Sequence, residues 1–257
     1  MKTTLKLSTF IVAIASVFTF SSCLDGSNGS TYPNYSSYVT ISGDPIMGYT
    51  FYSDFGSILR PTTASVQEVL PGLSNSVKRA YIAFDLASEA ENGKDLESNK
   101  IYDIILRSNP YANYALPTYM TIKHTENSDS LVSKNEFVQD INKDIWAING
   151  YLNALITINY DQNQRFYMNT YYTEEDIDVV NSTINLNLYY NSHSKNPNAQ
   201  GHSVISFKLP EDVVYTHQFP EDSIKLVLNA IKGYEESEFT KVGECMVAVK
   251  DFSEPRY

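Results

Sequence analysis

The sequence predicts an all-β protein with two domains, and three observations lead to this fold class. Short segments in which apolar and polar residues alternate recur along most of the chain, as in strands that bury one face. Twenty tyrosines and twelve phenylalanines accompany a single tryptophan, and aromatic side chains pack well on pleated sheets. Helical patterns are confined to short pieces at Ala64–Leu70 and Glu136–Ile141. We therefore expect strands nearly throughout, with little helix.

The first 22 residues have the features of a signal peptide. Two lysines, Lys2 and Lys6, precede an apolar run from Phe10 to Phe20, and the small residues Ser21 and Ser22 follow it. A basic start, a short apolar core and a small-residue cleavage site together direct secretion. A transmembrane helix is the alternative, but it needs roughly 20 apolar residues and this run is shorter. Residues 1–22 are therefore assigned to a cleaved signal peptide.

Cys23 directly follows the predicted cleavage site, which is the position that bacterial lipoproteins acylate. Two or more acyl chains hold a protein durably on a bilayer. We therefore expect a membrane anchor through the lipid on Cys23 and an outer-membrane location in the cell envelope. Surface-exported lipoproteins of the Bacteroidetes tend to carry a dense acidic run after this cysteine, whereas residues 24–26 contain one acid. Both the periplasmic and the surface face remain open to the mature protein.

Cys245 is the other cysteine of the chain. With Cys23 used by the lipid, the mature protein has no second thiol for an internal disulfide, so packed apolar cores must stabilise it. Cys245 opens the apolar segment Cys245–Val249, which indicates a buried strand. In such a place a cysteine behaves as a small hydrophobic residue.

The charge of the mature chain excludes nucleic acid as an expected partner. Cleavage after Ser22 removes two lysines and no acid, which leaves 17 basic against 30 acidic residues and a formal charge of −13. Phosphate recognition needs a basic patch, and the longest basic cluster is Lys78–Arg79. The acidic residues are dispersed in short groups, which indicates solvated loops whose charge keeps an exported protein soluble.

The first domain is expected over residues 44–125. A flexible tether, residues 23–43, precedes it and is rich in Ser, Gly, Asn and Tyr. A turn over Ser53–Gly56 joins two strands into a hairpin, and a polar segment over residues 124–133 marks the boundary to the second domain. The expected strands are Tyr49–Tyr52, Ser57–Arg60, Lys78–Leu86, Ile101–Leu106 and Tyr119–Ile122.

The second domain is expected over residues 126–257 and begins with another hairpin. Its expected strands are Tyr151–Ile158, Arg165–Met168, Ile184–Leu188, Ile205–Leu209, Ile224–Leu228 and Met246–Val249. About six antiparallel strands separated by turns are typical of a β-sandwich.

The order of these elements resembles the NigD-like lipoproteins of the Bacteroidales. Besides Cys23, the matching segments are Gly48–Pro61, Val77–Ile82, Ile145–Trp146, Gly150–Asn153 and Ile184–Asn191. The resemblance covers nearly all of the mature chain. It implies an N-terminal OB-like barrel of five short strands, followed by a C-terminal β-sandwich. It supplies no catalytic residue.

Four tyrosines in or beside expected loops form a candidate ligand platform: Tyr111, Tyr114, Tyr171 and Tyr172. They have asparagine neighbours, and sugars stack on exposed aromatic rings and hydrogen-bond to amides. OB barrels often bind oligosaccharides, so a glycan is the ligand class that such a platform would take. The alternative is that tyrosine and asparagine are simply common on exported β-proteins.

Other candidate sites carry weaker patterns. Ser130 lies in an Asp-Ser-Leu triplet that fits O-glycosylation in the Bacteroidetes. His193 and His202 flank a turn but lack a third ligand at zinc-site spacing, so no metal site is expected. His217 and Asp222 are not accompanied by the Gly-x-Ser-x-Gly elbow of a serine hydrolase. No catalytic residue is assigned.

The sequence therefore favours a non-catalytic, lipid-anchored envelope protein that acts through a protein partner and uses no cofactor. A glycan-binding envelope module is the alternative, and it requires an exposed tyrosine platform. An enzyme would instead require a pocket in which at least two titratable side chains converge with shifted pKa values.

Overall fold

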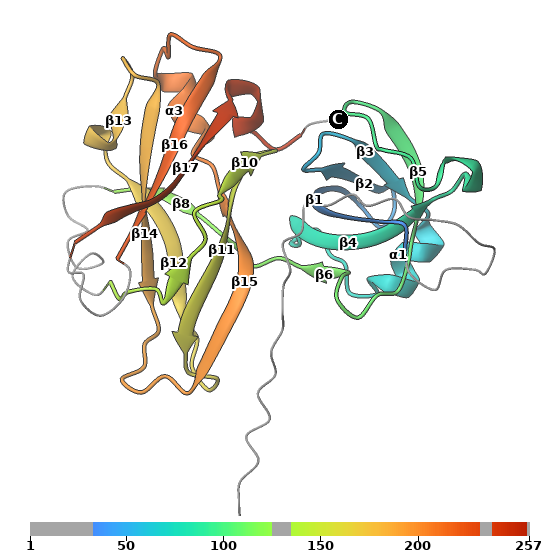
Figure 1. Ribbon diagram of the computed structural model, residues 1–257, viewed down its shortest axis with the longest axis horizontal. Helices are drawn as coiled ribbons and strands as arrows, with labels where there is room; N and C mark the ends of the chain where they lie inside the picture. The colour runs from blue at the N-terminus through green and yellow to red at the C-terminus, as the bar shows by residue number, and fades with distance from the viewer. Residues whose placement is uncertain (1–32, 125–134, 232–237, 256–257) are drawn as a thin grey trace, which may run out of the picture. The chain divides into compact units, whose positions relative to one another are not determined.

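The computed structural model describes residues 33–124, 135–231 and 238–255, most of which lie in strands or the turns between them (Figure 1). The all-β fold class is confirmed. Cys23 and Ser130 lie outside the described residues. Within the described ranges, no helix is long and apolar enough to cross a bilayer.

Five strands of the first domain close into a barrel. Their order is β1, β2, β3, β5 and β4, and a further pairing of β4 with β1 completes the circle. α1 (Thr63–Val69) lies between β3 and β4 in the chain. The arrangement is that of an OB-like barrel, as the resemblance implied. The strands are β1 (Tyr35–Asp44), β2 (Gly48–Ser53), β3 (Ile58–Pro61), β4 (Arg79–Leu86) and β5 (Ile101–Leu106).

Apolar side chains at alternate strand positions fill the barrel core. Successive side chains of a strand point to opposite faces, and in β4 the inward ones are Ala80, Ile82, Phe84 and Leu86. Val66 of α1 packs on the same core. The Thr62 hydroxyl accepts the backbone N–H of Ser65 at 3.3 Å and so caps the start of this helix. The helix expected near Ala64–Leu70 is therefore confirmed.

Asp85 stands on the outer face of β4 and ties the start of β1 to the end of β5. Its carboxylate accepts the backbone and side-chain N–H groups of Asn34, each at 2.8 Å, and the Arg107 Nε–H at 2.7 Å. Burial acts to raise the pKa of Asp85, but these hydrogen bonds outweigh it and lower the pKa. The carboxylate is therefore stabilised in its charged form.

Two sheets form the sandwich of the second domain. One has the order β10, β11, β15, β7, with β9 beside β11. The other has the order β17, β16, β14, β12, β8, with β13 beside β14. The first sheet comprises β7 (Thr118–Tyr119), β9 (Asp140–Ile141), β10 (Trp146–Ile148), β11 (Tyr151–Tyr160) and β15 (Ala199–Lys208). The second comprises β8 (Thr121–Lys123), β12 (Tyr167–Tyr172), β13 (Ile177–Asp178), β14 (Thr183–Asn191), β16 (Ser223–Ala230) and β17 (Thr240–Ala248).

Buried side chains from both sheets share one core. Leu152 and Phe207 come from the first sheet, and Ile184 and Leu226 come from the second. The β-sandwich is therefore confirmed. The remaining elements are β6 (Tyr114–Ala115), which pairs with β4, and the short helices η1 (Glu89–Glu91), η3 (Glu174–Asp176), α3 (Glu211–Thr216) and η4 (Val249–Phe252).

The sandwich differs from the expected set of antiparallel strands. β14 runs parallel to β16, β12 parallel to β8, and β15 parallel to β7. The sandwich is therefore mixed. The helix expected at Glu136–Ile141 is wrong, because Asp140–Ile141 forms β9 against β11.

Two expected boundaries also shift. The tether predicted over residues 23–43 is too long, because β1 already begins at Tyr35 and pairs with β2 and β4. The boundary at residue 125 comes too late, because β7 and β8 pair with β15 and β12. Their residues therefore belong to the sheets of the sandwich.

Candidate functional site

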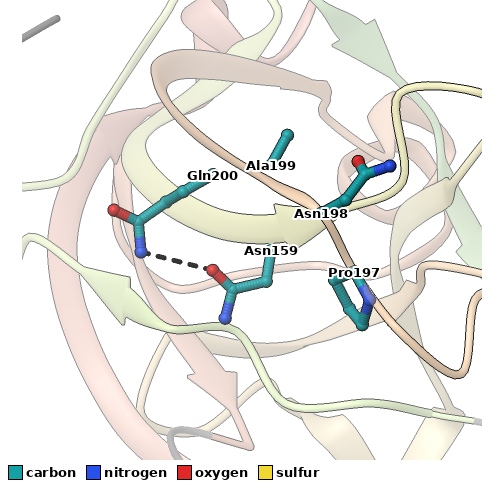
Figure 2. Close-up of a pocket in the computed structure, with 5 residues that line it drawn as sticks. All are labelled: Asn159, Pro197, Asn198, Ala199 and Gln200. Atoms are coloured by element: carbon teal, nitrogen blue, oxygen red, sulfur yellow. Dashed lines mark hydrogen bonds between the residues drawn. The ribbon is translucent and has the colours of Figure 1, made fainter. Parts of the chain in front are cut away.

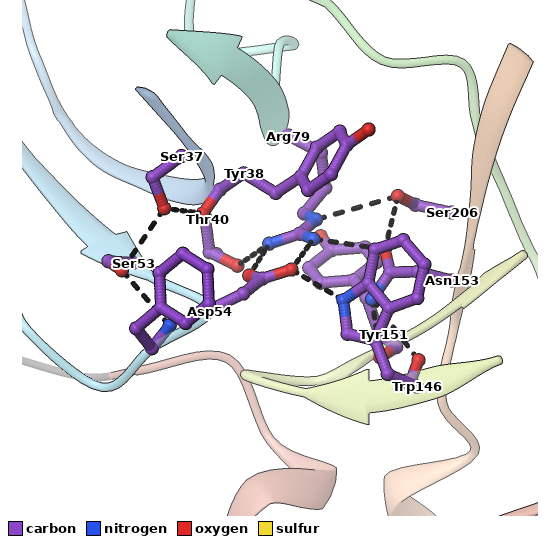
Figure 3. A network of polar contacts seen from close by, with 11 residues as sticks. Ser37, Tyr38, Thr40, Ser53, Asp54, Arg79, Trp146, Tyr151, Asn153 and Ser206 are labelled. Carbon is purple, nitrogen blue, oxygen red and sulfur yellow. Dashed lines mark hydrogen bonds and ion pairs between the residues drawn. The ribbon is translucent and has the colours of Figure 1, made fainter. Parts of the chain in front are cut away.

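A buried ion pair lies where residues of the barrel meet residues of the sandwich (Figure 3). Arg79, the first residue of β4, is 0% exposed. Its two terminal nitrogens donate to the two carboxylate oxygens of Asp54, with Nη1 to Oδ1 at 2.6 Å and Nη2 to Oδ2 at 2.7 Å. Such bidentate pairs are among the strongest hydrogen bonds in proteins. Asp54 lies in the turn between β2 and β3 that the sequence predicted.

Three side chains of the sandwich complete this network (Figure 3). Asn153 of β11 accepts from Arg79 Nη2 at 3.0 Å, and Ser206 of β15 accepts from Arg79 Nε at 3.5 Å. The indole N–H of Trp146, in β10, donates to Asp54 Oδ2 at 2.7 Å. We call these five residues, Asp54, Arg79, Trp146, Asn153 and Ser206, the junction network.

The guanidinium group of Arg79 is fully paired. Thr40 accepts the fifth N–H, from Nη1, at 2.9 Å, and the Tyr151 ring centroid lies 5.7 Å from Arg79 Cζ. Burial and a hydrogen bond to Glu254 raise the pKa of the Tyr151 phenol. Because a buried charge is costly unless its partners surround it, this geometry suits a structural joint between the two domains.

A row of four aromatic rings starts at Trp146 of the junction network and continues through three tyrosines of the barrel sheet. The ring centroids lie 5.4 Å apart for Trp146 and Tyr38, 4.7 Å for Tyr38 and Tyr81, and 5.8 Å for Tyr81 and Tyr114. Such separations are favourable for aromatic pairs. Trp146, Tyr38 and Tyr81 are half-buried, and Tyr114 is 40% exposed. The row therefore reinforces the junction.

The four predicted platform tyrosines do not share one surface. Tyr172 is 2% exposed in the sandwich core, and its hydroxyl donates to Asp212 at 3.3 Å, so its assignment to an exposed platform is wrong. Tyr171 points to the other face of β12, where burial raises its pKa to about 12. Tyr114 contacts Tyr81 on the barrel, and Tyr111 is 78% exposed. A ligand role for Tyr111, Tyr114 and Tyr171 stays a prediction.

An open hollow of about 350 Å³ lies at one end of the sandwich (Figure 2). Its lining residues are Asn159, Pro197, Asn198, Ala199 and Gln200. Asn159 and Gln200 are opposite each other in the β11–β15 pairing, and Gln200 Nε2 donates to Asn159 Oδ1 at 3.2 Å. The lining therefore combines side-chain amides with small apolar groups.

His202 and His217 have polar partners, and Cys245 packs against the sandwich core. The Nδ1 atom of His202 lies 2.7 Å from the Thr157 hydroxyl, and His217 Nε2 lies 3.4 Å from a Glu174 carboxylate oxygen. Within the described ranges, no three His, Cys, Asp or Glu side chains gather as metal ligands. Cys245 lies in β17, but it is half-buried rather than fully buried as the sequence predicted; partial burial raises its pKa to about 12.

The fold and its junction define a class of protein: an OB-like β-barrel followed by a β-sandwich. Residues 118–241 match the model of the NigD-like C-terminal beta sandwich domain. This part of the chain is similar to that domain, and the resemblance to NigD-like proteins seen in the sequence is confirmed.

Solved structures of proteins from Parabacteroides and Bacteroides share the fold. A candidate toxin-related protein from Parabacteroides distasonis superposes with a TM-score of 0.58 at 14% identity, over 84% of this chain and 94% of that one. A candidate lipoprotein from Bacteroides fragilis gives 0.52 at 11% identity, over 84% and 97%. A NigD-like immunity protein from Bacteroides caccae gives 0.52 at 15% identity, over 80% and 90%. No curated protein matches the sequence.

Proposed function

We propose that the protein is a lipid-anchored, non-catalytic protein of the outer membrane that acts by binding another protein. The sequence around Cys23 supports the anchor, and the shared fold with a candidate Bacteroides fragilis lipoprotein is in keeping with it. The shared fold with a NigD-like immunity protein is in keeping with a binding role. The junction network supports a non-catalytic role, because its charged groups are saturated by fixed partners.

The turn between β1 and β2 carries the proposal of a protein partner. Ile46 and Met47 at its tip are 92% and 85% exposed. Two adjacent large apolar side chains with so little cover are unfavourable in water, and they suit a contact surface. We call this pair the apolar tip.

The apolar tip is held in a fixed turn. The Asp44 carboxylate accepts the backbone N–H of Ile46 at 2.7 Å and that of Met47 at 2.8 Å. Glycines with φ of +96° and +92°, Gly43 and Gly48, flank the turn. A preformed loop loses little entropy on binding, and a few apolar anchors in a partner's pocket carry most of the energy of a protein interface.

The negative charge beside the apolar tip favours a protein pocket over a lipid surface as its binding partner. Asp44 is the one charged residue in the stretch 42–52, and it carries the sign that repels an anionic leaflet. A protein with an apolar pocket and hydrogen-bond donors at its rim complements both the tip and Asp44.

Complementation of a deletion strain in the native host tests the proposal. The double variant Ile46→Ser/Met47→Ser is expected to fail to restore the envelope phenotype, while remaining in the membrane fraction. Val180→Ser is the matched control, because Val180 is an equally exposed apolar residue at another turn, 85% exposed, and it should complement fully. Cys23→Ser should move the protein from the membrane to the soluble fraction. Full complementation by the double variant would refute the role of the tip, and membrane retention of Cys23→Ser would refute the anchor.

A further inference from the structure

We propose that the hollow beside Asn159 and Gln200 is a binding site for a neutral saccharide (Figure 2). This site is separate from the apolar tip, and it goes beyond the protein-binding role proposed above. None of the tyrosines predicted as a glycan platform is among its lining residues.

A chain of three side-chain amides crosses the sheet at the hollow. Gln200 Nε2 donates to Asn159 Oδ1 at 3.2 Å, and Asn159 Nδ2 donates to Gln139 Oε1 at 3.1 Å. Each amide therefore fixes the orientation of the next. Gln200 Oε1 at one end is left as an acceptor, and Gln139 Nε2 at the other end as a donor, within the part of the chain that the structure describes.

The backbone beneath these amides is anchored. The Asn159 carbonyl oxygen accepts the hydroxyl of Tyr190, a core residue, at 2.6 Å. The Gln139 N–H donates to the Thr157 carbonyl oxygen at 2.9 Å. Amides held in this way lose little freedom when a ligand binds.

The opposite wall is a turn held by Asp161. Asn198 Nδ2 donates to Asp161 Oδ1 at 3.2 Å, and Asn198 Oδ1 accepts the backbone N–H of Gln162 at 3.0 Å. The Asn163 backbone N–H and further side-chain donors lower the pKa of Asp161. The turn is thereby fixed, with Pro197 and Ala199 facing the hollow.

The chemistry of the lining selects the class of ligand. No charged side chain is among the lining residues, and the ionised Asp161 behind the wall opposes an anion. Phosphates and acidic sugars are therefore disfavoured. Mixed amide donors and acceptors match hydroxyl groups, which both donate and accept. The Pro197 ring and the Ala199 methyl offer apolar contact to the C–H groups of a sugar ring. The volume lies at the lower end of the ~300–1,000 Å³ of small-molecule pockets, so a short stretch of a glycan fits.

A glycan array tests the site directly. The full-length lipoprotein, purified from its native host in a polyoxyethylene detergent that carries no sugar, is applied to immobilised neutral oligosaccharides and to their uronate and sulfate counterparts. Binding to at least one neutral oligosaccharide is expected, with the acidic counterparts bound more weakly. Absence of binding to every neutral oligosaccharide, or a preference for the acidic ones, overturns the proposal.

Variants then place the binding. Gln200→Ala removes one end of the amide chain and the support for Asn159, and it is expected to weaken binding of the neutral oligosaccharide about tenfold, as for the loss of one or two hydrogen bonds. Gln67→Ala is the matched control, because it removes an exposed side-chain amide on α1, in the other domain and outside the lining, and it should bind like the wild type. Unchanged binding by Gln200→Ala overturns the site. Circular dichroism and the Tm of both variants confirm that they fold.

Discussion

Removal of the Asp54 carboxylate tests the junction network most severely. Asp54→Ala deletes both hydrogen bonds to Arg79 and the one from the Trp146 indole. It leaves the guanidinium buried without its counter-charge. Removal of one partner of a buried ion pair costs about 3–5 kcal/mol, and we expect the free energy of unfolding to fall by that amount.

A double variant separates the ion pair from general damage. Arg79→Met removes the charge that Asp54 neutralises, so Asp54→Ala/Arg79→Met should cost less than the two single changes added together. The expected coupling energy is about 2 kcal/mol, within the usual range for residues in direct contact. Glu244→Ala is the control, because it breaks the exposed pair of Lys241 and Glu244 and should leave the free energy of unfolding unchanged.

Fluorescence gives the assay a local probe. Trp146 is the single tryptophan of the chain, and its indole N–H lies in the junction network. Urea unfolding followed by tryptophan fluorescence and by far-ultraviolet circular dichroism should give one shared transition for the wild type. A cost below about 1 kcal/mol for Asp54→Ala, or full additivity in the double variant, would refute the interpretation of a coupled buried pair.

Three further predictions concern other parts of the chain. Gly150→Ala should lower the free energy of unfolding by about 3 kcal/mol, because Gly150 has a φ of +84° and an added Cβ would lie 2.8 Å from the Glu254 backbone nitrogen. Gly93→Ala is the control and should cost less, because Gly93 has a similar φ of +82° but no neighbour within 4 Å of the added Cβ. Equal losses of Tm in the two variants would rule out the clash. The pKa of Asp85 is lowered in the folded protein, so its contribution to the free energy of unfolding is present above its unfolded pKa of about 3.9 and is lost as pH falls through the folded value. Asp85→Asn should therefore reduce the loss of stability at acidic pH. An unchanged loss at acidic pH would contradict the assignment. Cys245, with its pKa raised to about 12, should react slowly with maleimide at pH 7.5 in the folded state and rapidly in urea, and equal rates contradict its burial.

Alternation in the sequence was sufficient to predict four of the five barrel strands, β2 to β5, and most strands of the sandwich, whereas most of β1 lay in the segment predicted as a tether. β4 and β14 bury alternate apolar residues against a core, so a period of two residues can be recognised in their sequences. The strands β7 and β8, of two and three residues, are too short to give such a period. Their parallel partners are distant in the chain, so pairing direction could not be predicted.

The position of the tyrosines shows a second limit. Tyr171 and Tyr172 are neighbours in the sequence, but neighbours in a strand face opposite sides of the sheet. Tyr172 is therefore in the core, while Tyr171 lies on the outer face. The sequence indicated a strand near both residues, but the choice of face depends on the register with β14.

The junction network gives a structural role to segments that the sequence analysis identified only by their resemblance to NigD-like lipoproteins. Arg79 lies in Val77–Ile82, and Trp146 and Asn153 lie in the segments Ile145–Trp146 and Gly150–Asn153. Their side chains meet although Arg79 and Asn153 are 74 positions apart. An arginine at the start of a largely apolar strand was the signal available. Its partners could not be inferred, because they depend on how the two domains pack.

The central claim is that the protein binds a protein partner through the apolar tip. A photoreactive benzoylphenylalanine in place of Met47, incorporated in the native host, tests it most directly, with the same group in place of Val180 as the control. We expect a discrete cross-linked protein adduct from position 47 that is absent from position 180 and is lost when Ile46→Ser is added. Cross-links to lipid alone, or equal cross-linking from both positions, would contradict it.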